Sequence, residues 1–174
     1  MTASNLTITT LYDLYDTEVS RYLHAEIQLK KFLAVWTNSV HSLSLKSILH
    51  KYQNFIDEHI YKLNALVDEE KIQSIPLTNK IMTAFLEDAE YKLLLCADPE
   101  VKDACLLASI QIINHFKIST YGTGAAFANA LENNIQAGLL HEAEENEKEI
   151  DRRLTYVAEH EINIRATAPI LLHQ

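Results

Sequence analysis

Apolar residues recur at intervals of three and four over four long stretches of the chain, and this spacing constrains the fold more than any other feature. It places apolar side chains on one face of an α-helix, and that face has to be buried against other helices. The 174 residues include only three glycines and three prolines, too few for the turns of a many-stranded protein. The sequence therefore predicts an all-α protein.

Helix breakers and capping residues divide the chain into five predicted helices, four long and one short. They are expected at about residues 9–38, 42–70, 79–95, 99–131 and 135–166. The expected caps are Thr9 or Thr10, Ser42 or Ser44, Thr78, and Asp98 followed by Pro99. The short third helix lies between the second and fourth predicted helices, and this order predicts an up-down four-helix bundle with a short fifth crossover helix.

The length suits a single domain, because 48% hydrophobic residues are enough for one continuous core. Residues 1–168 are expected to form the helical bundle, and residues 169–174, from Pro169 onward, a C-terminal tail. Gly122 and Gly124 fall inside the fourth predicted helix, where missing side chains would let a neighbouring helix approach closely.

The charge balance argues against nucleic acid and membrane partners. The formal net charge is -9, with no run of lysine or arginine to offset it, so phosphate backbones and anionic lipid surfaces are repelled. No stretch of about 18 uncharged apolar residues occurs, and the N-terminal segment lacks the basic and apolar regions of a leader. We therefore expect a cytoplasmic protein. Cys96 and Cys105 lie in apolar segments and are expected to be buried, reduced thiols.

The segment IINHFKISTYG, residues 112–122, lies inside the fourth predicted helix. It contains three polar residues among apolar ones: Asn114, His115 and Lys117. A long four-helix bundle can hold an internal di-metal site built from glutamates and two Glu-x-x-His motifs. Those motifs do not occur here in good order. The nearest matches are Glu26, the acidic run EENEKEID and the segment EHEIN, and on spacing alone each is typical of a solvated acidic face.

Three segments resemble motifs of the YciE/YciF family of ferritin-like bundles. HAEIQLKKFL resembles the family's A-E-x-Q-L motif in its first helix. VKDACLLASIQIINHFKISTYGT resembles V-x-D-A-x-L-I-A-A-A-Q-x-V-E-H-Y-E-I-A-x-Y-G-T, and LLHEAEENEKEIDRRL resembles L-L-x-E-T-L-x-E-E-K-x-x-D-x-x-L. The resemblance runs from about Tyr22 to Ala158 and implies a ferritin-like fold, a stress-associated role and family positions for a di-metal centre.

The chain departs from the family at several of these positions. Where the family has V-E-H-Y-E, Asn114 and Lys117 replace both glutamates while His115 stays, and Tyr52 falls on the position of a family histidine. The vestigial metal-site positions implied by the resemblance are Glu26, Tyr52, Asn114, Lys117, Glu147 and Asp151. Clustered buried carboxylates repel one another unless a cation relieves the repulsion. We therefore expect the ammonium of Lys117 to replace the metal.

In this interpretation Lys117 reaches Glu26 or Glu147 inside the bundle, and Asn114 and Tyr52 fill the remaining space. The alternative is that Lys117 extends to the surface and Asn114 bonds a backbone carbonyl. His115, next to Asn114, is expected to point sideways as a packing residue.

The remaining polar side chains carry little signal. Histidines 24, 41, 50, 59, 141, 160 and 173 are scattered along the chain. His24 lies two residues before Glu26, and His141 lies three and four residues before Glu144 and Glu145. The hydroxyls of Tyr15, Thr120 and Tyr121 have no partner base, so nucleophilic catalysis is not supported.

We expect a protein without a cofactor and without enzyme activity, acting as a structural or stress-associated interaction protein, with a homodimer as its assembly and an unknown protein partner. The alternative is an oxidase or ferroxidase-like protein that binds iron or another divalent metal. Its candidate ligands are Glu26, Glu144, Glu147, Asp151 and His115.

Overall fold

The computed structural model describes residues 7–69 and 78–167, and every regular element in these ranges is helical. The elements are α1 (Leu11–Ser39), α2 (Leu43–Glu69), α3 (Lys80–Leu95), α4 (Pro99–Ala130), α5 (Asn134–Val157), the π-helical turn η1 (Ala158–Ile162) and α6 (Asn163–Ala166). Among them no helix combines the length and the apolar character that crossing a bilayer would require. The predicted all-α class is confirmed.

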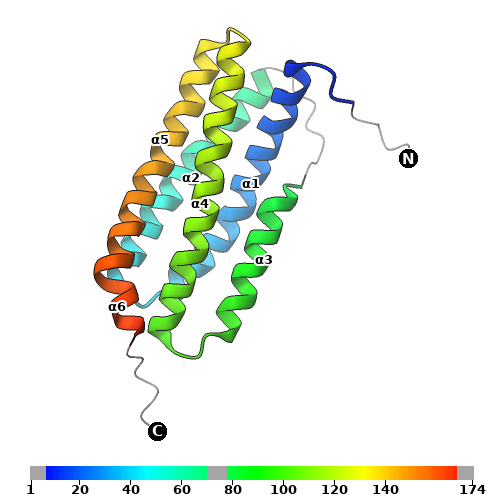
Figure 1. The fold of residues 1–174 in the computed structure, drawn as a ribbon. Coiled ribbons are helices and arrows are strands. Elements are labelled where there is room, and N and C mark those ends of the chain that lie inside the picture. The colour runs from blue at the N-terminus through cyan, green and yellow to red at the C-terminus, as the bar shows by residue number, and fades with distance from the viewer. Residues whose placement is uncertain (1–6, 70–77, 168–174) are drawn as a thin grey trace.

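The four long helices form a bundle in which every adjacent pair is antiparallel. α1 packs against α2 and α4, and α5 packs against the same two helices. In Figure 1, α1 and α5 descend while α2 and α4 rise, so the parallel pairs lie on the diagonals. α3 returns the chain along the outside of the bundle, against α1 and α4. This long crossover is what allows α2 and α4 to run in the same direction, as in ferritin-like bundles.

Most helix ends follow the predicted capping. Thr10 caps α1 in a capping box with Asp13, and Asp98 caps α4 by accepting bonds from two backbone amides. Ser42, rather than Ser44, caps α2, since its Oγ accepts the amide of Leu45 at 3.2 Å. The predicted end of the second helix near Glu70 and the predicted tail at 169–174 lie outside the described residues.

The predicted cap of α3 at Thr78 is wrong by one residue. Asn79 is the cap, because its Oδ1 accepts the amide of Met82 at 3.0 Å. Its Nδ2 donates to the backbone carbonyl of Arg21 at 3.1 Å. The side chain of Asn79 therefore accepts one of the free backbone amides at the start of α3 and also joins this helix to α1. A threonine hydroxyl is too short to make both contacts.

The predicted fifth helix is interrupted near its end. It continues to Ala166, but residues 158–162 form a π-turn. Such a turn holds one extra residue and shifts the side chains that follow it. Within it, Glu161 accepts a hydrogen bond from Ser42 Oγ at 2.8 Å and lies 3.2 Å from Arg165. The widened turn thus coincides with a contact between η1 and Ser42, the residue before α2.

The cysteines are half-buried, where full burial was predicted. Cys96 ends α3 and Cys105 lies in the seam between α3 and α4, at the edge of the core.

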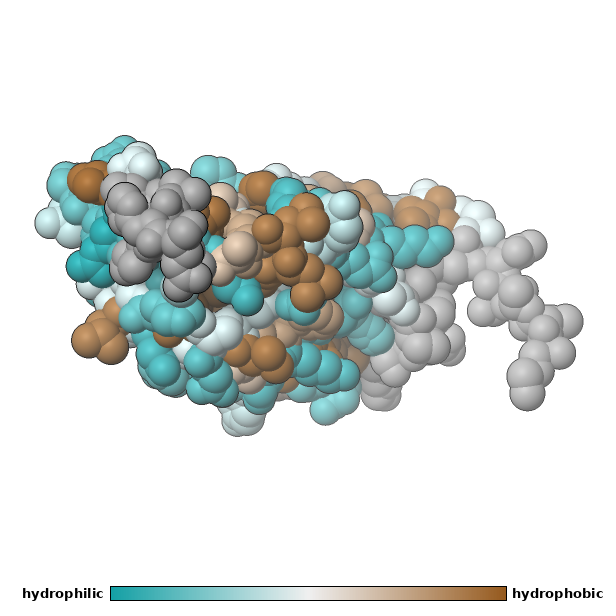
Figure 2. All heavy atoms as spheres, turned by 90° about the horizontal axis from the view of Figure 1, so that it is seen from below, coloured by the Kyte–Doolittle hydropathy of each residue, from teal (hydrophilic) through white to brown (hydrophobic). Residues whose placement is uncertain are grey.

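The end of the bundle at the bottom of Figure 1 carries hydrophobic side chains among hydrophilic ones when it is seen from below (Figure 2).

The apolar core is divided into two clusters by a band of polar residues. The larger cluster includes Leu33, Trp36, Leu49, Leu106 and Leu154, and α3 covers it from outside. The smaller cluster fills the opposite end of the bundle with residues such as Val19, Leu63, Ala128 and Leu140. The polar band between them lies halfway along the bundle.

Gly124 marks a close approach between α4 and the side chains of α1 and α5. A Cβ atom there would lie 2.9 Å from Cε2 of Tyr22 and 3.3 Å from Cδ1 of Leu140. The ring of Tyr22 is buried and packs edge-on against Tyr121, so it has no room to move aside. This confirms that a missing side chain in the fourth helix permits close packing.

Gly124→Ala should lower the free energy of unfolding by about 1–3 kcal/mol, the usual range for overpacking a well-filled core. The matched control is Gly138→Ala on the exposed face of α5, where no atom lies within 4 Å of the added methyl group. It should instead stabilise the fold by about 0.5–1 kcal/mol, because alanine loses less backbone entropy in a helix. Urea unfolding of both variants measures the difference, and an equal effect of the two substitutions would contradict the close contact.

Candidate functional site

Each of the four long helices sends polar side chains into the middle of the core. We call this set the polar layer: Glu26 from α1, Tyr52 and His59 from α2, Asn114, Lys117 and Tyr121 from α4, and Glu147 from α5. No member is more than 2% exposed. Charged side chains at this depth are rare unless they are paired.

Lys117 lies at the centre of the polar layer. Its Nζ is 2.9 Å from Oε2 of Glu26 and 2.6 Å from Oε1 of Glu147. It also donates to the hydroxyl of Tyr52 at 3.3 Å and lies 4.6 Å from the centre of that ring. The predicted internal ion pair of Lys117 is confirmed, and the alternative in which this side chain extends to the surface is wrong.

The second oxygen of each carboxylate faces hydrogen-bonding side chains. Oε1 of Glu26 lies 3.1 Å from Nδ1 of His59 and accepts a hydrogen bond from the hydroxyl of Tyr121. Oε2 of Glu147 accepts from Tyr52 and from Nδ2 of Asn114, each at 2.7 Å. Each carboxylate therefore gives one oxygen to the ammonium and the other to hydrogen-bond donors.

Asn114 and Tyr52 act as predicted, as hydrogen-bonding neighbours of the ion pair. Asn114 also bonds a backbone carbonyl, that of Glu147 at 3.0 Å, so its side chain combines both roles that the sequence left open. The other ring nitrogen of His59 lies 3.4 Å from the amide nitrogen of Asn146. His59 therefore contacts the layer through one ring nitrogen and α5 through the other.

Burial and charge act in opposite directions on the pKa values of the layer. Burial alone would raise the pKa of Glu26, but the charge of Lys117, together with His59 and Tyr121, lowers it from 4.5 to about 2. Burial would lower the pKa of Lys117, but Glu147 and Glu26 outweigh it and raise the pKa. Burial first, and then the carboxylates, raise the pKa of Tyr52 and Tyr121 well above 10. Both phenols therefore stay protonated and can donate.

His59 and Tyr121 belong to the site although the sequence reasoning did not assign them to it. Their positions carried a usable signal. His59 follows Tyr52 by seven residues, two turns along one helix face, and Tyr121 follows Lys117 by four. His59 was already part of the apolar stripe of its helix, so its burial could have been expected.

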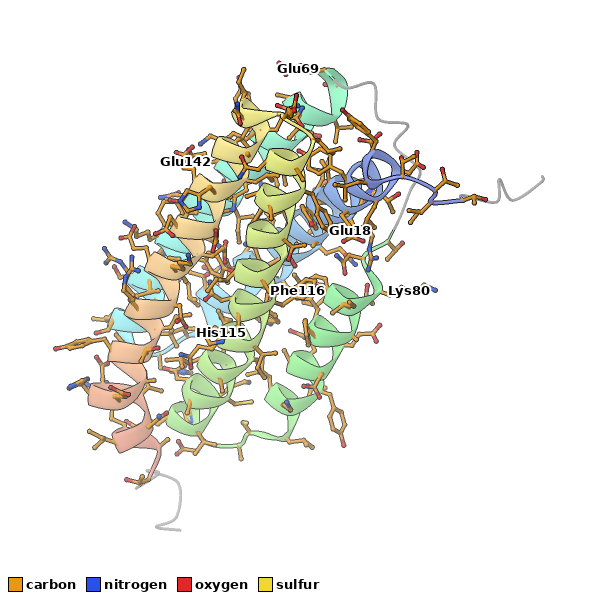
Figure 3. All side chains as sticks on the ribbon, turned by 45° about the horizontal axis from the view of Figure 1, so that its top comes forward. Glu18, Glu69, Lys80, His115, Phe116 and Glu142 are labelled. Atoms are coloured by element: carbon orange, nitrogen blue, oxygen red, sulfur yellow. The ribbon has the colours of Figure 1, made fainter. Side chains whose placement is uncertain are left out.

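Asp151 and His115 lie outside the polar layer, which corrects the prediction for Asp151. His115 Nε2 lies 2.8 Å from Oδ1 of Asp151, and the side chains are 65% and 27% exposed. Ile150 takes the inward position after Glu147 and turns Asp151 toward the surface. His115 does point sideways as predicted, toward α5, but it is exposed and not a packing residue (Figure 3).

Glu144 is also outside the layer, in the seam between α4 and α5. Its carboxylate lies 2.7 Å from the ammonium of Lys148 and 3.2 Å from Nδ1 of His141. Gly122 leaves room for it, since a Cβ there would lie 3.3 Å from Cδ of Glu144.

Two groups of described residues could offer three ligand atoms to a metal ion. Glu26, His59 and Glu147 form the buried group, and His141, Glu144 and Glu145 the surface group, with ligand atoms within 4.8 Å of one another. In each group a lysine ammonium already lies between the carboxylates, Lys117 in the first and Lys148 in the second. An ammonium at these distances repels a divalent cation, so neither group fits a metal as it stands.

The polar layer is also too tightly packed for a substrate. The cavity beside it, lined by Glu26, Lys117 and Tyr121 among others, has a volume of about 10 Å³. That volume is at the lower limit for a single water molecule. The arrangement can hold charges in fixed positions, but it offers no space for a reacting molecule.

Comparisons with known proteins agree with this architecture. A family model described as "Domain of unknown function (DUF892)" matches residues 10–167. The chain is 29% identical over 158 residues to Protein YciF of Escherichia coli (strain K12), covering 90% of this chain and 95% of that protein. The resemblance to the YciE/YciF family is confirmed.

Solved structures show the same fold. The crystal structure of the E. coli stress protein YciF matches with a TM-score of 0.83 at 28% identity, covering 90% of this chain and 99% of that one. YcfI of Rhodopseudomonas palustris, to which a structural role is ascribed, matches with a TM-score of 0.83 at 22% identity, covering 91% and 99%. At 22% identity, the match to YcfI shows only that the two chains share a fold.

Lys117→Met should lower the free energy of unfolding by roughly 3 kcal/mol, because it leaves two buried carboxylates without their cation. The matched control is Lys30→Met, which removes a lysine 2.6 Å from Asp57 on the surface, where both side chains are more than half exposed. That loss should be below about 1 kcal/mol. Denaturant unfolding at neutral pH compares them, and similar losses would mean that burial adds nothing to the ion pair.

The destabilisation caused by Lys117→Met should shrink as the pH falls. In the parent the pKa of Glu26 is lowered from 4.5 to about 2, so its stabilising contribution is complete above about 4.5 and is lost as the pH falls toward 2. Without the ammonium, burial raises the pKa of Glu26, and protonation at low pH relieves the buried charge. Unfolding measured at pH values from about 7 to about 3 tests this, and a difference that widens on acidification would contradict it.

Proposed function

The chain belongs to the DUF892 family of domains of unknown function, and from this premise we propose a ferritin-like bundle that has exchanged its di-metal centre for an internal ion pair. The protein then acts without catalysis, as a structural or stress-associated interaction protein. No metal cofactor is part of this function.

One observation carries the proposal: the Nζ of Lys117 lies 2.9 Å from Glu26 and 2.6 Å from Glu147. Two carboxylates on facing helices need a nearby positive charge to remain buried and ionised. The ammonium supplies that charge from the chain itself. A metal ion bound by the same oxygens would come within a few ångströms of the ammonium and be repelled by it.

A non-catalytic role follows from how the two carboxylates of the polar layer are occupied. The carboxylate oxygens face Lys117 or accept hydrogen bonds from Tyr52, Tyr121, Asn114 and His59. General acid or base catalysis needs a group within hydrogen-bond reach of a substrate. With a cavity of about 10 Å³ beside it, the layer is out of reach of any substrate.

One relative supports the biological part of the proposal: YciF of E. coli is described as a stress protein. The proposal also includes a cytoplasmic location and a homodimeric assembly. Large apolar side chains that are mostly exposed in the single chain support the dimer, among them Leu43, Leu94 and Leu95. Light scattering of the purified protein measures the assembly.

The rival function is a metal-binding oxidase or ferroxidase-like protein. One observation favours it: Glu26, His59 and Glu147 bring three ligand atoms within 4.8 Å of one another. To use them, a metal would have to displace Lys117 from both carboxylates and leave its ammonium buried without a partner. That cost weighs against binding.

Elemental analysis of protein purified without a histidine tag and without added metal separates the two functions. We expect fewer than about 0.1 metal ions per chain, against about two for an intact di-metal bundle. Addition of iron, manganese or zinc should leave the melting temperature of the parent unchanged, since a metal that does not bind the folded state cannot stabilise it.

The positive control is the variant Tyr52→His, Asn114→Glu, Lys117→Glu, which restores the residue types of the family at three positions around Glu26 and Glu147. Without metal it should be less stable than the parent, because carboxylates crowd in the core. With metal its melting temperature should rise with metal concentration. If the parent gained more from metal than the triple variant, the replacement of the metal by Lys117 would be wrong.

A further inference from the structure

The packing of α3 on α4 brings together the two cysteines of the chain. These helices are antiparallel neighbours, and the rings of Phe85 and Phe116 meet across the seam with centroids 5.6 Å apart. Cys96 lies eleven residues after Phe85, and Cys105 eleven residues before Phe116. Eleven residues are about three helical turns, so the cysteines occupy the same seam at the α3–α4 connection.

The two thiols are neighbours there. Cys96 is the C-cap residue of α3, and its Sγ donates to the carbonyl of Lys92 at 3.3 Å. Burial first, and then the neighbouring Cys96 thiol, raises the pKa of Cys105 to about 11, against the opposing charge of Lys92. This influence of Cys96 on Cys105 agrees with the helix register, which places both thiols at this end of the seam.

Both cysteines are only half-buried, so a small oxidant can reach them. They are the only cysteines in the sequence, and each is therefore the other's only partner within the chain. The polar layer does not involve this pair, which lies at the end of the bundle.

We propose that Cys96 and Cys105 form a site of reversible oxidation, at which a peroxide converts the two thiols into a disulfide joining the end of α3 to α4. The site is independent of the proposed function of the polar layer.

The chemistry balances with hydrogen peroxide as the two-electron oxidant. The thiolate of Cys96 attacks one peroxide oxygen, the O–O bond breaks, and hydroxide leaves, so that Cys96 becomes a sulfenic acid. The sulfur of Cys105 then attacks that of Cys96, and water leaves as the S–S bond forms. Cys96 reacts first because Cys105 is held as the protonated thiol at neutral pH. A small-molecule dithiol returns both electrons and reverses the reaction.

The disulfide would act on the helix that lies outside the four long helices. α3 packs mainly against α1 and α4. Its C-terminal end is held by Cys96 and by the connection to Pro99. A covalent bond to Cys105 would close a short loop and restrain the opening of this helix.

The test is oxidation of the full-length protein at neutral pH with a small excess of hydrogen peroxide. The expected product is a monomeric chain about 2 Da lighter, since two hydrogens are lost as the disulfide forms, with neither thiol labelled by iodoacetamide. Dithiothreitol should restore the mass and the labelling of both thiols. Hydrogen exchange of the α3 amides should be slower in the oxidised protein than in the reduced one.

Cys96→Ser and Cys105→Ser are the matched controls, and neither should show the mass loss or the slower exchange. Cys105→Ser should accumulate the sulfenic acid on Cys96, which dimedone traps, while Cys96→Ser should react more slowly. The proposal is overturned if the parent gives mainly disulfide-linked dimers or sulfinic acid, or if both thiols remain free while the single variants are oxidised.

Discussion

The ammonium of Lys117 between Glu26 and Glu147 is the interaction on which the arrangement of this bundle depends. Three helices, α1, α4 and α5, each bury a charged side chain at the same level, and no one of these charges is tolerable there alone. The gain in free energy over an apolar core is small or even negative, because desolvation offsets most of the attraction. What the ion pair does provide is a strong penalty for any arrangement that separates the three side chains.

That penalty acts on the register of the helices. Sliding or rotating any one helix would leave a carboxylate or the ammonium unpaired in an apolar environment, whereas leucines and isoleucines can repack with less loss. The polar layer divides the apolar core into two clusters, so each half can pack independently once the layer is aligned. Tyr52 and His59 bring α2 into the same network, and Gly124 sets how closely α4 approaches Tyr22 beyond it.

Several members of the layer could be predicted from residue types alone, and others could not. Lys117, Asn114 and Glu147 stood out as polar residues at inward helical positions or at positions matched to a family motif. His59 and Tyr121 also occupy inward positions. A histidine or tyrosine on the apolar face of a helix is common, however, and does not by itself indicate a polar site. The prediction placed Asp151 at the internal site, but its side chain lies at the surface. A position one helical turn after Glu147 can face either the core or the side of the helix. The choice depends on Ile150, which fills the core there.

The sequence by itself determined the helices, their approximate ends and the class of the fold, because helical periodicity and capping are local properties of the chain. The motif resemblance extended this to the family. Only the tertiary structure decided which oxygen of each carboxylate faces Lys117, that His59 and Tyr121 complete the layer, and that α3 packs on the outer side of α4. These contacts join residues up to 95 positions apart, as between Glu26 and Tyr121. They depend on how whole helices rotate and approach one another, and no local pattern of residues encodes that.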